Sequence, residues 1–345
     1  MSGSADSPAW RDWLRTAGRL DRRFAGHHAP ASFRYHQPVA LQPEVPARLR
    51  RAYDVPVACT DWGPRDAPVL LCCGGVANSA MRFAFLAADL AREGHRVLCM
   101  DWLGRGRSGW LADGSEYVLA SYVEQLRQVI DQLDVGPVAL LGSSMGGSAA
   151  LALAASDPQR VSRLLLNDVG PHIPQARRAL RAQTLARHYV FRTPEDIMRR
   201  AGAAQKHDGP VGDEVRLFIA YHQTRWSDED AGRVYRHDPR ALLAYQRDAA
   251  RSVDQWDAWA QLRCPVLLLH GMESDALSLA TIARMQRLHP LSLVHVPDTG
   301  HTPVLSDRHQ TATIGAWLRS AERDALAPAE YSVPRAPLRR PWPGG

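Results

Sequence analysis

Hydrophobic residues in this chain form short apolar runs that alternate with longer stretches of helical spacing. The runs that have the length of buried strands are Pro56–Asp61, Val69–Cys73, Arg96–Asp101, Val138–Gly142, Arg163–Asp168, Pro265–His270 and Ser292–Val296. Helical spacing predicts helices at 79–93, 117–134, 145–156 and 307–321. Because strands that alternate with helices form parallel sheets, the pattern predicts an α/β fold, with a mostly parallel central sheet flanked by helices.

One interval, residues 171–261, breaks this alternation. It is helical in pattern and rich in arginine, and it contains no convincing strand. It separates two strands that should be neighbours, which divides the predicted core into residues 37–170 and 262–325. We therefore expect a helical insertion that covers one edge of the sheet.

The two ends of the chain differ from the core. Residues 1–36 form a basic extension, in which 8–24 has an amphipathic helical pattern with apolar positions at Trp10, Trp13, Leu14, Ala17, Leu20 and Phe24. Such a helix either packs on its own protein body, which we favour, or contacts a membrane surface or a partner. Residues 326–345 are rich in proline and lack periodicity, so they predict an extended or disordered tail.

The formal net charge of +6 is concentrated at these ends. Residues 1–36 carry six Arg against three Asp, and residues 326–345 carry three Arg against one Glu, so the body is close to neutral. A nucleic-acid-binding protein would need a concentrated basic face, and we expect none here. The chain lacks an apolar run long enough to span a bilayer, and its first residues lack the pattern of a secretion signal. We expect a cytoplasmic protein.

The five cysteines, Cys59, Cys72, Cys73, Cys99 and Cys264, lie in or beside apolar runs. Their number is odd, and none has the spacing of a zinc site. We expect buried free thiols, and neither a metal nor an organic cofactor.

The strongest chemical signal is the segment Gly142-Ser143-Ser144-Met145-Gly146. It is a G-x-S-x-G motif that follows an apolar strand and opens an Ala-rich helix, which is the context of a nucleophile elbow. The turn is sharp, and side chains at positions 142 and 146 would collide with neighbouring backbone. Ser144 is therefore the predicted nucleophile.

A serine nucleophile needs a histidine base and an acid that orients it, here in the chain order Ser, Asp, His. His301 lies in the loop after the run 292–296, and Asp275 lies beyond the end of the run 265–270. We predict a triad of Ser144, Asp275 and His301. Asp168, at the end of another strand, remains an alternative acid. Other candidates fit less well. His270 precedes Asp275, and His295 lies inside a strand. Asp298 is close to His301 in sequence, a spacing that more often stabilises a loop, and Glu273 is the least favoured alternative.

Two further groups of residues belong to the predicted site. The oxyanion formed during acyl transfer would be bound by the backbone N–H groups of Met145 and of Gly75, which follows the run 69–73. Aromatic residues of the insertion, Phe218, Tyr221, Trp226 and Tyr235, with Tyr245, are candidate walls for a substrate.

Taken together, these motifs resemble the α/β-hydrolase superfamily over roughly residues 53–321, and more narrowly a bacterial group of serine hydrolases with a GTSMGG-type elbow. The segments that carry the resemblance are DWLGRGRSGWL (101–111), GSSMGG (142–147), LLLNDVGP (164–171), HDPRAL (237–242), ESDALS (273–278) and GHTPVL (300–305). It implies that 171–261 is a cap and that Ser144, Asp275 and His301 form the triad. Many relatives have His-Gly before the oxyanion residue, where this chain has Cys73-Gly74.

The expected function is hydrolysis of a carboxylic ester or lactone through an acyl-enzyme, with a small molecule as substrate. The same residues also suit hydrolysis of a C–C bond or cofactor-free perhydrolysis. A third alternative is a ligand receptor that kept the fold and lost catalysis. The arginines of the insertion are compatible with an acidic or hydroxy-acyl substrate, but we favour solvated ion pairs as their explanation.

Overall fold

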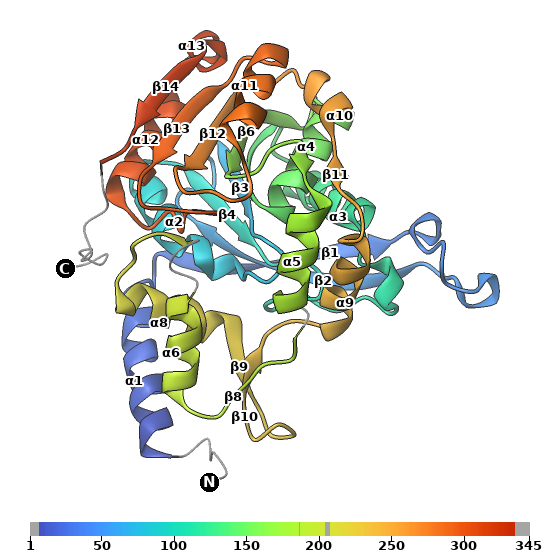
Figure 1. Ribbon diagram of the computed structural model, residues 1–345, viewed down its shortest axis with the longest axis vertical. Helices are drawn as coiled ribbons and strands as arrows, with labels where there is room; N and C mark the ends of the chain where they lie inside the picture. Colours follow the sequence, from blue (N-terminus) through green and yellow to red (C-terminus); the bar gives the residue numbers. More distant parts are fainter. Residues whose placement is uncertain (1–6, 186, 204–207, 335–345) are drawn as a thin grey trace.

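The computed structural model describes residues 7–185, 187–203 and 208–334 (Figure 1). Their centre is a sheet in which β2 and its two neighbours run antiparallel and all other neighbours run parallel. In sheet order the strands are β1 (His28–Gln37), β2 (Tyr53–Trp62), β4 (Arg96–Met100), β3 (Val69–Cys73), β5 (Val138–Ser143), β6 (Val161–Asn167), β12 (Val266–Gly271), β13 (Ser292–Val296) and β14 (Ala329–Ser332). The predicted fold class is confirmed.

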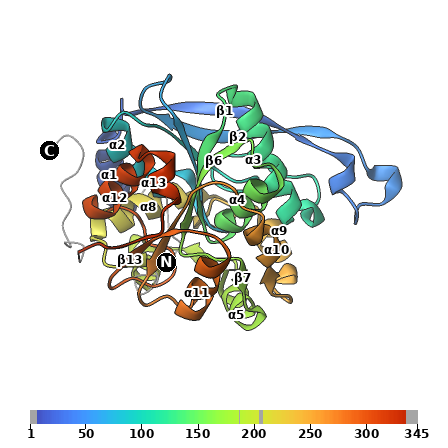
Figure 2. The ribbon, with the colours of Figure 1, turned by 90° about the horizontal axis from the view of Figure 1, so that it is seen from above.

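Two of these strands were not predicted. β1 pairs with β2 along its whole length, and the pair extends beyond the body of the protein (Figure 2). β14 pairs with β13 at the opposite edge. The boundary predicted after residue 36 therefore cuts a strand, and the predicted tail contributes residues 329–332 to the sheet. Both strands lie at sheet edges; β14 is mostly exposed and β1 buries only two of its ten residues, so neither produces an apolar run.

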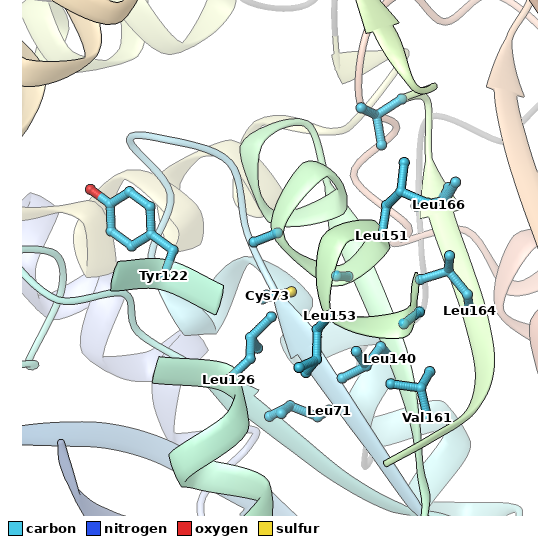
Figure 3. Close-up of a cluster of buried hydrophobic side chains, with 14 of the residues drawn as sticks. Leu71, Cys73, Tyr122, Leu126, Leu140, Leu151, Leu153, Val161, Leu164 and Leu166 are labelled. Atoms are coloured by element: carbon cyan, nitrogen blue, oxygen red, sulfur yellow. The ribbon is translucent and has the colours of Figure 1, made fainter. Parts of the chain in front are cut away.

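Helices cover both faces of the sheet, because its central strands are apolar on both sides. One face carries α3 (Leu119–Leu133), α4 (Met145–Ser156), α10 (Trp256–Ala260) and α11 (Leu279–Leu288). The other carries α2 (Ala84–Arg92), α12 (Arg308–Arg319) and α13 (Glu322–Leu326). Leu71 and Leu140 pack against Leu153 of α4 on the first face (Figure 3). The five cysteines are buried free thiols, as predicted.

The interval 171–261, called the cap below, connects β6 to β12. Its helices are α5 (Gln175–Leu185), α6 (Pro194–Ala203), α8 (Asp213–Gln223), α9 (Pro239–Asp248) and α10. It also contains short strands that the sequence did not predict: β8 (Val190–Phe191), β9 (Thr224–Ser227) and β10 (Gly232–Tyr235) form a small sheet, and β7 (His172–Ile173) pairs with β11 (Val253–Asp254). Strands of two to four residues are too short to produce a visible alternation.

The predicted N-terminal helix is α1 (Pro8–Arg22), which begins after the capping residue Ser7. It lies against α6 and α8 of the cap (Figure 1). The buried residues of α1 are Trp10, Trp13, Ala17 and Leu20, and the two tryptophans pack against residues of the cap. The favoured interpretation, a helix that packs on its own protein, is confirmed. Among the described residues, no helix combines the length and the apolar character needed to cross a membrane.

Candidate active site

Ser144 stands at the junction of β5 and α4, with φ 52° and ψ −119°. An L-residue rarely adopts this conformation, and the two flanking glycines permit it. A Cβ on Gly142 would lie 2.4 Å from Gly147 Cα, and one on Gly146 would lie 2.4 Å from the carbonyl oxygen of Cys73. The close approach inferred from the motif is therefore present at both glycines.

His301 lies in the loop between β13 and α12 and is almost fully buried. Its Nδ1 is 3.0 Å from Oδ2 of Asp168. Its Nε2 is buried and has no hydrogen-bond partner among the described residues. Burial lowers the pKa of the imidazole; the hydrogen bond to Asp168 acts in the opposite direction, and the charge of Arg177 lowers the pKa further. A neutral imidazole whose Nδ1 is held by a carboxylate can accept a proton at Nε2.

The carboxylate that contacts His301 is that of Asp168, and the structure does not bring the predicted acid, Asp275, to this histidine. Asp168 follows β6 with φ 52° and is fully buried. Its Oδ1 accepts the backbone N–H of Gly271 at 3.0 Å, and its Oδ2 accepts the hydroxyl of Ser274. The side chain of Asp275 is 50% exposed and pairs instead with Arg177 at 3.0 Å.

The physical reason lies in the sheet order. β6 and β12 are direct neighbours, so the end of β6 brings Asp168 within hydrogen-bond reach of the loop that follows β12. Asp275 lies four residues beyond β12 and is directed toward α5 of the cap. A position just after a strand is typical of an acid at such a site, and Asp168 and Asp275 both occupy such a position.

The two predicted oxyanion donors lie beside Ser144 but differ in their state. Met145 is the first residue of α4, where backbone N–H groups have no partner within the helix. Gly75 approaches Ser144, since a Cβ at position 75 would lie 3.6 Å from Ser144 Cβ. Its N–H, however, donates to Oδ1 of Asn78 at 3.0 Å. The structure therefore shows the Gly75 N–H engaged by the Asn78 side chain.

A cavity of about 530 Å³ opens between the core and the cap, and Ser144 and His301 both line it. Of the predicted aromatic walls, Tyr235 and Tyr245 line this cavity, together with Tyr189 and Phe191, which were not predicted. Phe218 packs instead against Phe24 and Phe85 in the core.

Tyr221 and Trp226 are also absent from the lining. They contact Trp13 and Trp10 of α1, with ring centroids 6.0 Å and 5.8 Å apart. Sequence distance does not reveal that α1 covers this part of the cap, so the prediction could not separate these aromatics from the lining ones.

The cavity is basic. Arg82, Arg177, Arg181, Arg200 and Arg216 line it, against two carboxylates, Asp208 and Asp275. His237 lines it as well, and burial lowers the pKa of this imidazole to about 4.

The other histidines considered lie elsewhere. His270 contacts the carbonyl oxygen of Leu277 through Nε2, and His295 pairs with Glu330 at the edge of the sheet. Within the described part of the chain, no three His, Cys, Asp or Glu side chains are grouped so as to hold a metal ion.

Comparison with known proteins supports the same architecture. Residues 67–307 match the family described as alpha/beta hydrolase fold. The 3-hydroxybutyrate-oligomer hydrolase of Cupriavidus necator is 33% identical over 279 residues, which are 77% of this chain and 92% of that protein.

Two other relatives cover different shares of the chain. The 2-hydroxy-6-oxononadienedioate/2-hydroxy-6-oxononatrienedioate hydrolase of Escherichia coli is 32% identical over 138 residues, 37% of this chain and 47% of that protein. An alpha/beta hydrolase structure from Novosphingobium aromaticivorans superimposes with a TM-score of 0.69 at 26% identity, over 84% of this chain and 97% of that one.

Proposed function

Because the chain belongs to the alpha/beta hydrolase family, we propose that it is a serine hydrolase of carboxylic esters in which Ser144, His301 and Asp168 act together. The observation that carries the proposal is the contact of 3.0 Å between His301 Nδ1 and Asp168 Oδ2. It leaves His301 Nε2 without a partner in the described residues, in the cavity that Ser144 also lines.

In this mechanism His301 Nε2 takes the hydroxyl proton of Ser144 as its oxygen attacks the ester carbonyl. Asp168 holds the imidazole and stabilises its cation, and the N–H of Met145 stabilises the oxyanion. His301 then gives the proton to the alcohol oxygen, which leaves. Water, activated by the same imidazole, hydrolyses the acyl-enzyme to the free acid.

As substrate class we propose short esters of hydroxy acids. This rests on the relative from Cupriavidus necator, which acts on 3-hydroxybutyrate oligomers by name and aligns over 92% of its length. The cavity under the cap, about 530 Å³ in volume, has the size of a small-molecule site.

A fluorophosphonate probe and two esters, p-nitrophenyl butyrate and the linear dimer of 3-hydroxybutyrate, test the proposal. We expect the probe to label Ser144 and both esters to be hydrolysed, with Ser144→Ala abolishing label and turnover. Ser143→Ala is the matched control, because Ser143 is a buried neighbour that accepts a hydrogen bond from Asn167 and lies outside the cavity lining. A Ser144→Ala protein that still reacts with the probe would overturn the assignment.

Hydrolysis of a C–C bond is the second candidate, favoured by the similarity to the Escherichia coli hydrolase over 138 residues. It uses the same serine, histidine and aspartate. Labelled protein that hydrolyses a ring-cleavage dioate and neither ester would select this candidate. Protein that takes no label and turns over none of these substrates would favour a receptor that has lost catalysis.

A further inference from the structure

The helix α5 presents two arginines to the cavity from one face. Arg177 and Arg181 are four residues apart, so their side chains emerge on the same side of the helix. Both line the cavity with Ser144 and His301. Burial lowers the pKa of His301, and the positive charges of Arg177 and Arg181 lower it further.

The neighbouring Arg178 provides a useful contrast. It lies on the other side of α5, donates to the carbonyl oxygens of Asp248 and Arg251, and pairs with the Asp248 carboxylate. Its guanidinium is therefore used to attach α5 to α9, which lie side by side in Figure 1. Arg177 makes a single ion pair, with Asp275, and Arg181 makes no such attachment to any described residue.

Other basic side chains in the cavity have partners. Arg82 pairs with Asp208 at 2.9 Å and donates to the carbonyl oxygen of Thr302, and Arg216 pairs with Asp213 at 2.9 Å. Arg200 lies over the ring of Tyr189, 4.4 Å from its centre. These contacts offset the cost of removing each charge from water.

Arg181 differs from all of them. It is partly buried, yet it has no hydrogen bond or ion pair to any residue within 7–185, 187–203 or 208–334. Beside it, Arg177 pairs with Asp275 through one terminal nitrogen, while its buried Nε has no partner among those residues. Burial lowers the pKa of Arg181 and the charge of Arg177 lowers it further, while the carboxylates of Asp275 and Asp208 act in the opposite direction without forming an ion pair with it. A desolvated guanidinium that lacks a directly bonded anion is unfavourable.

We infer that Arg181, with Arg177, binds a free carboxylate of the substrate close to the bond that is cleaved. The planar guanidinium suits a carboxylate because it can donate two parallel hydrogen bonds. The inference rests on the proposed ester hydrolysis and narrows it to esters that carry an acid group near the scissile carbonyl. A dimer of a hydroxy acid has such a group on its alcohol half, and a neutral ester of the same size lacks it.

The test compares the 3-hydroxybutyrate dimer with its terminal carboxamide, which has the same shape and no charge. In the wild-type protein, kcat/KM for the acid is expected to be about tenfold or more higher than for the carboxamide, because a charge-assisted hydrogen bond contributes roughly that much binding free energy. In Arg181→Gln this ratio is expected to fall close to one. Arg199→Gln is the matched control, since Arg199 is another cap arginine, is 76% exposed and does not line the cavity; it should keep the wild-type ratio.

A binding experiment separates failure of this inference from failure of the proposed function. Calorimetry with Ser144→Ala protein should give tighter binding of the acid than of the carboxamide, and the difference should disappear in Ser144→Ala/Arg181→Gln. This binding result would support the inference even if the wild type hydrolysed neither dimer. Absence of hydrolysis would contradict only the proposed ester hydrolysis. Equal binding of acid and carboxamide, or an unchanged preference without Arg181, would overturn it.

Discussion

His301 Nδ1 and Asp168 Oδ2 lie 3.0 Å apart although 133 residues separate them in the chain. Asp168 is also fixed by the backbone N–H of Gly271 and the hydroxyl of Ser274. The carboxylate is thus held by groups from β12 and the loop after it, and it holds the imidazole in turn.

Asp168→Asn should therefore lower kcat by about 10,000-fold, the size of effect seen when a triad carboxylate is neutralised. Asp275→Asn removes a carboxylate that contacts Arg177 and not His301, so its kcat should fall by less than about tenfold. Steady-state kinetics on p-nitrophenyl butyrate measure both. If Asp275→Asn proved the more damaging change, the assignment of the acid would be reversed.

The pH profile of kcat/KM should depend on the arginines of α5. Burial lowers the pKa of His301 below its ordinary value of 6.5, so activity should persist below that pH. Arg177 lowers this pKa as well. Removing its positive charge makes protonation easier, so Arg177→Gln should shift the acidic limb of the profile to higher pH. Arg199→Gln should leave the limb in place, and a shift of the Arg177→Gln limb to lower pH would contradict the placement of this charge.

His237 should make the protein less stable in acid. Its pKa is lowered to about 4 from 6.5 by burial, so between these values the unfolded chain binds a proton that the folded protein does not. The free energy of unfolding should consequently fall as the pH drops from 6.5 to about 4. His237→Gln should reduce this dependence of the unfolding free energy on pH, which urea titrations at a series of pH values measure. Identical slopes in the wild type and His237→Gln would exclude this role.

The nucleophile elbow should not tolerate side chains at its glycines. A Cβ at Gly142 would meet the backbone of Gly147 at 2.4 Å, which cannot be relieved by a side-chain rotation. Gly142→Ala should lower stability by about 2 kcal/mol or more and remove labelling of Ser144. Gly202→Ala is the control, because no atom of the described residues outside its own helix backbone lies within 4 Å of a Cβ placed there, and α6 should gain roughly 0.5 kcal/mol. Thermal unfolding distinguishes the two changes.

The contact of α1 with the cap should contribute to folding stability. Trp10 is 1% exposed, and its indole N–H donates to the carbonyl oxygen of Arg192. Trp10→Ala should cost about 3–5 kcal/mol, as a truncated core aromatic does. Leu14 lies on the same helix at 36% exposure, and Leu14→Ala should cost less than about 1 kcal/mol. Equal, small losses in denaturant titrations would mean that α1 does not pack on the cap in solution.

The sequence by itself determined the central strands and the elbow. Strands β3 and β13 match the predicted runs residue for residue. β3 is buried on both faces and is therefore apolar throughout, and β13 keeps three apolar residues, Leu293, Val294 and Val296. The elbow is recognisable from a short motif, because Gly142 is constrained by the backbone of Gly146 and Gly147, a few residues away. Gly146 is constrained in addition by the backbone of Cys73 on the neighbouring strand. Edge strands β1 and β14 escaped prediction because exposed strands need no apolar pattern.

Only the tertiary structure decided which acid serves His301 and which side chains face the cavity. Asp168 and Asp275 both follow strands, and local sequence does not separate them. Their difference arises because β6 lies directly beside β12, while the segment carrying Asp275 turns toward α5. In the same way, α1 covers Tyr221 and Trp226 and leaves Tyr235 to the cavity. Contacts between distant segments depend on how the elements pack, and periodicity along the chain carries no record of that packing.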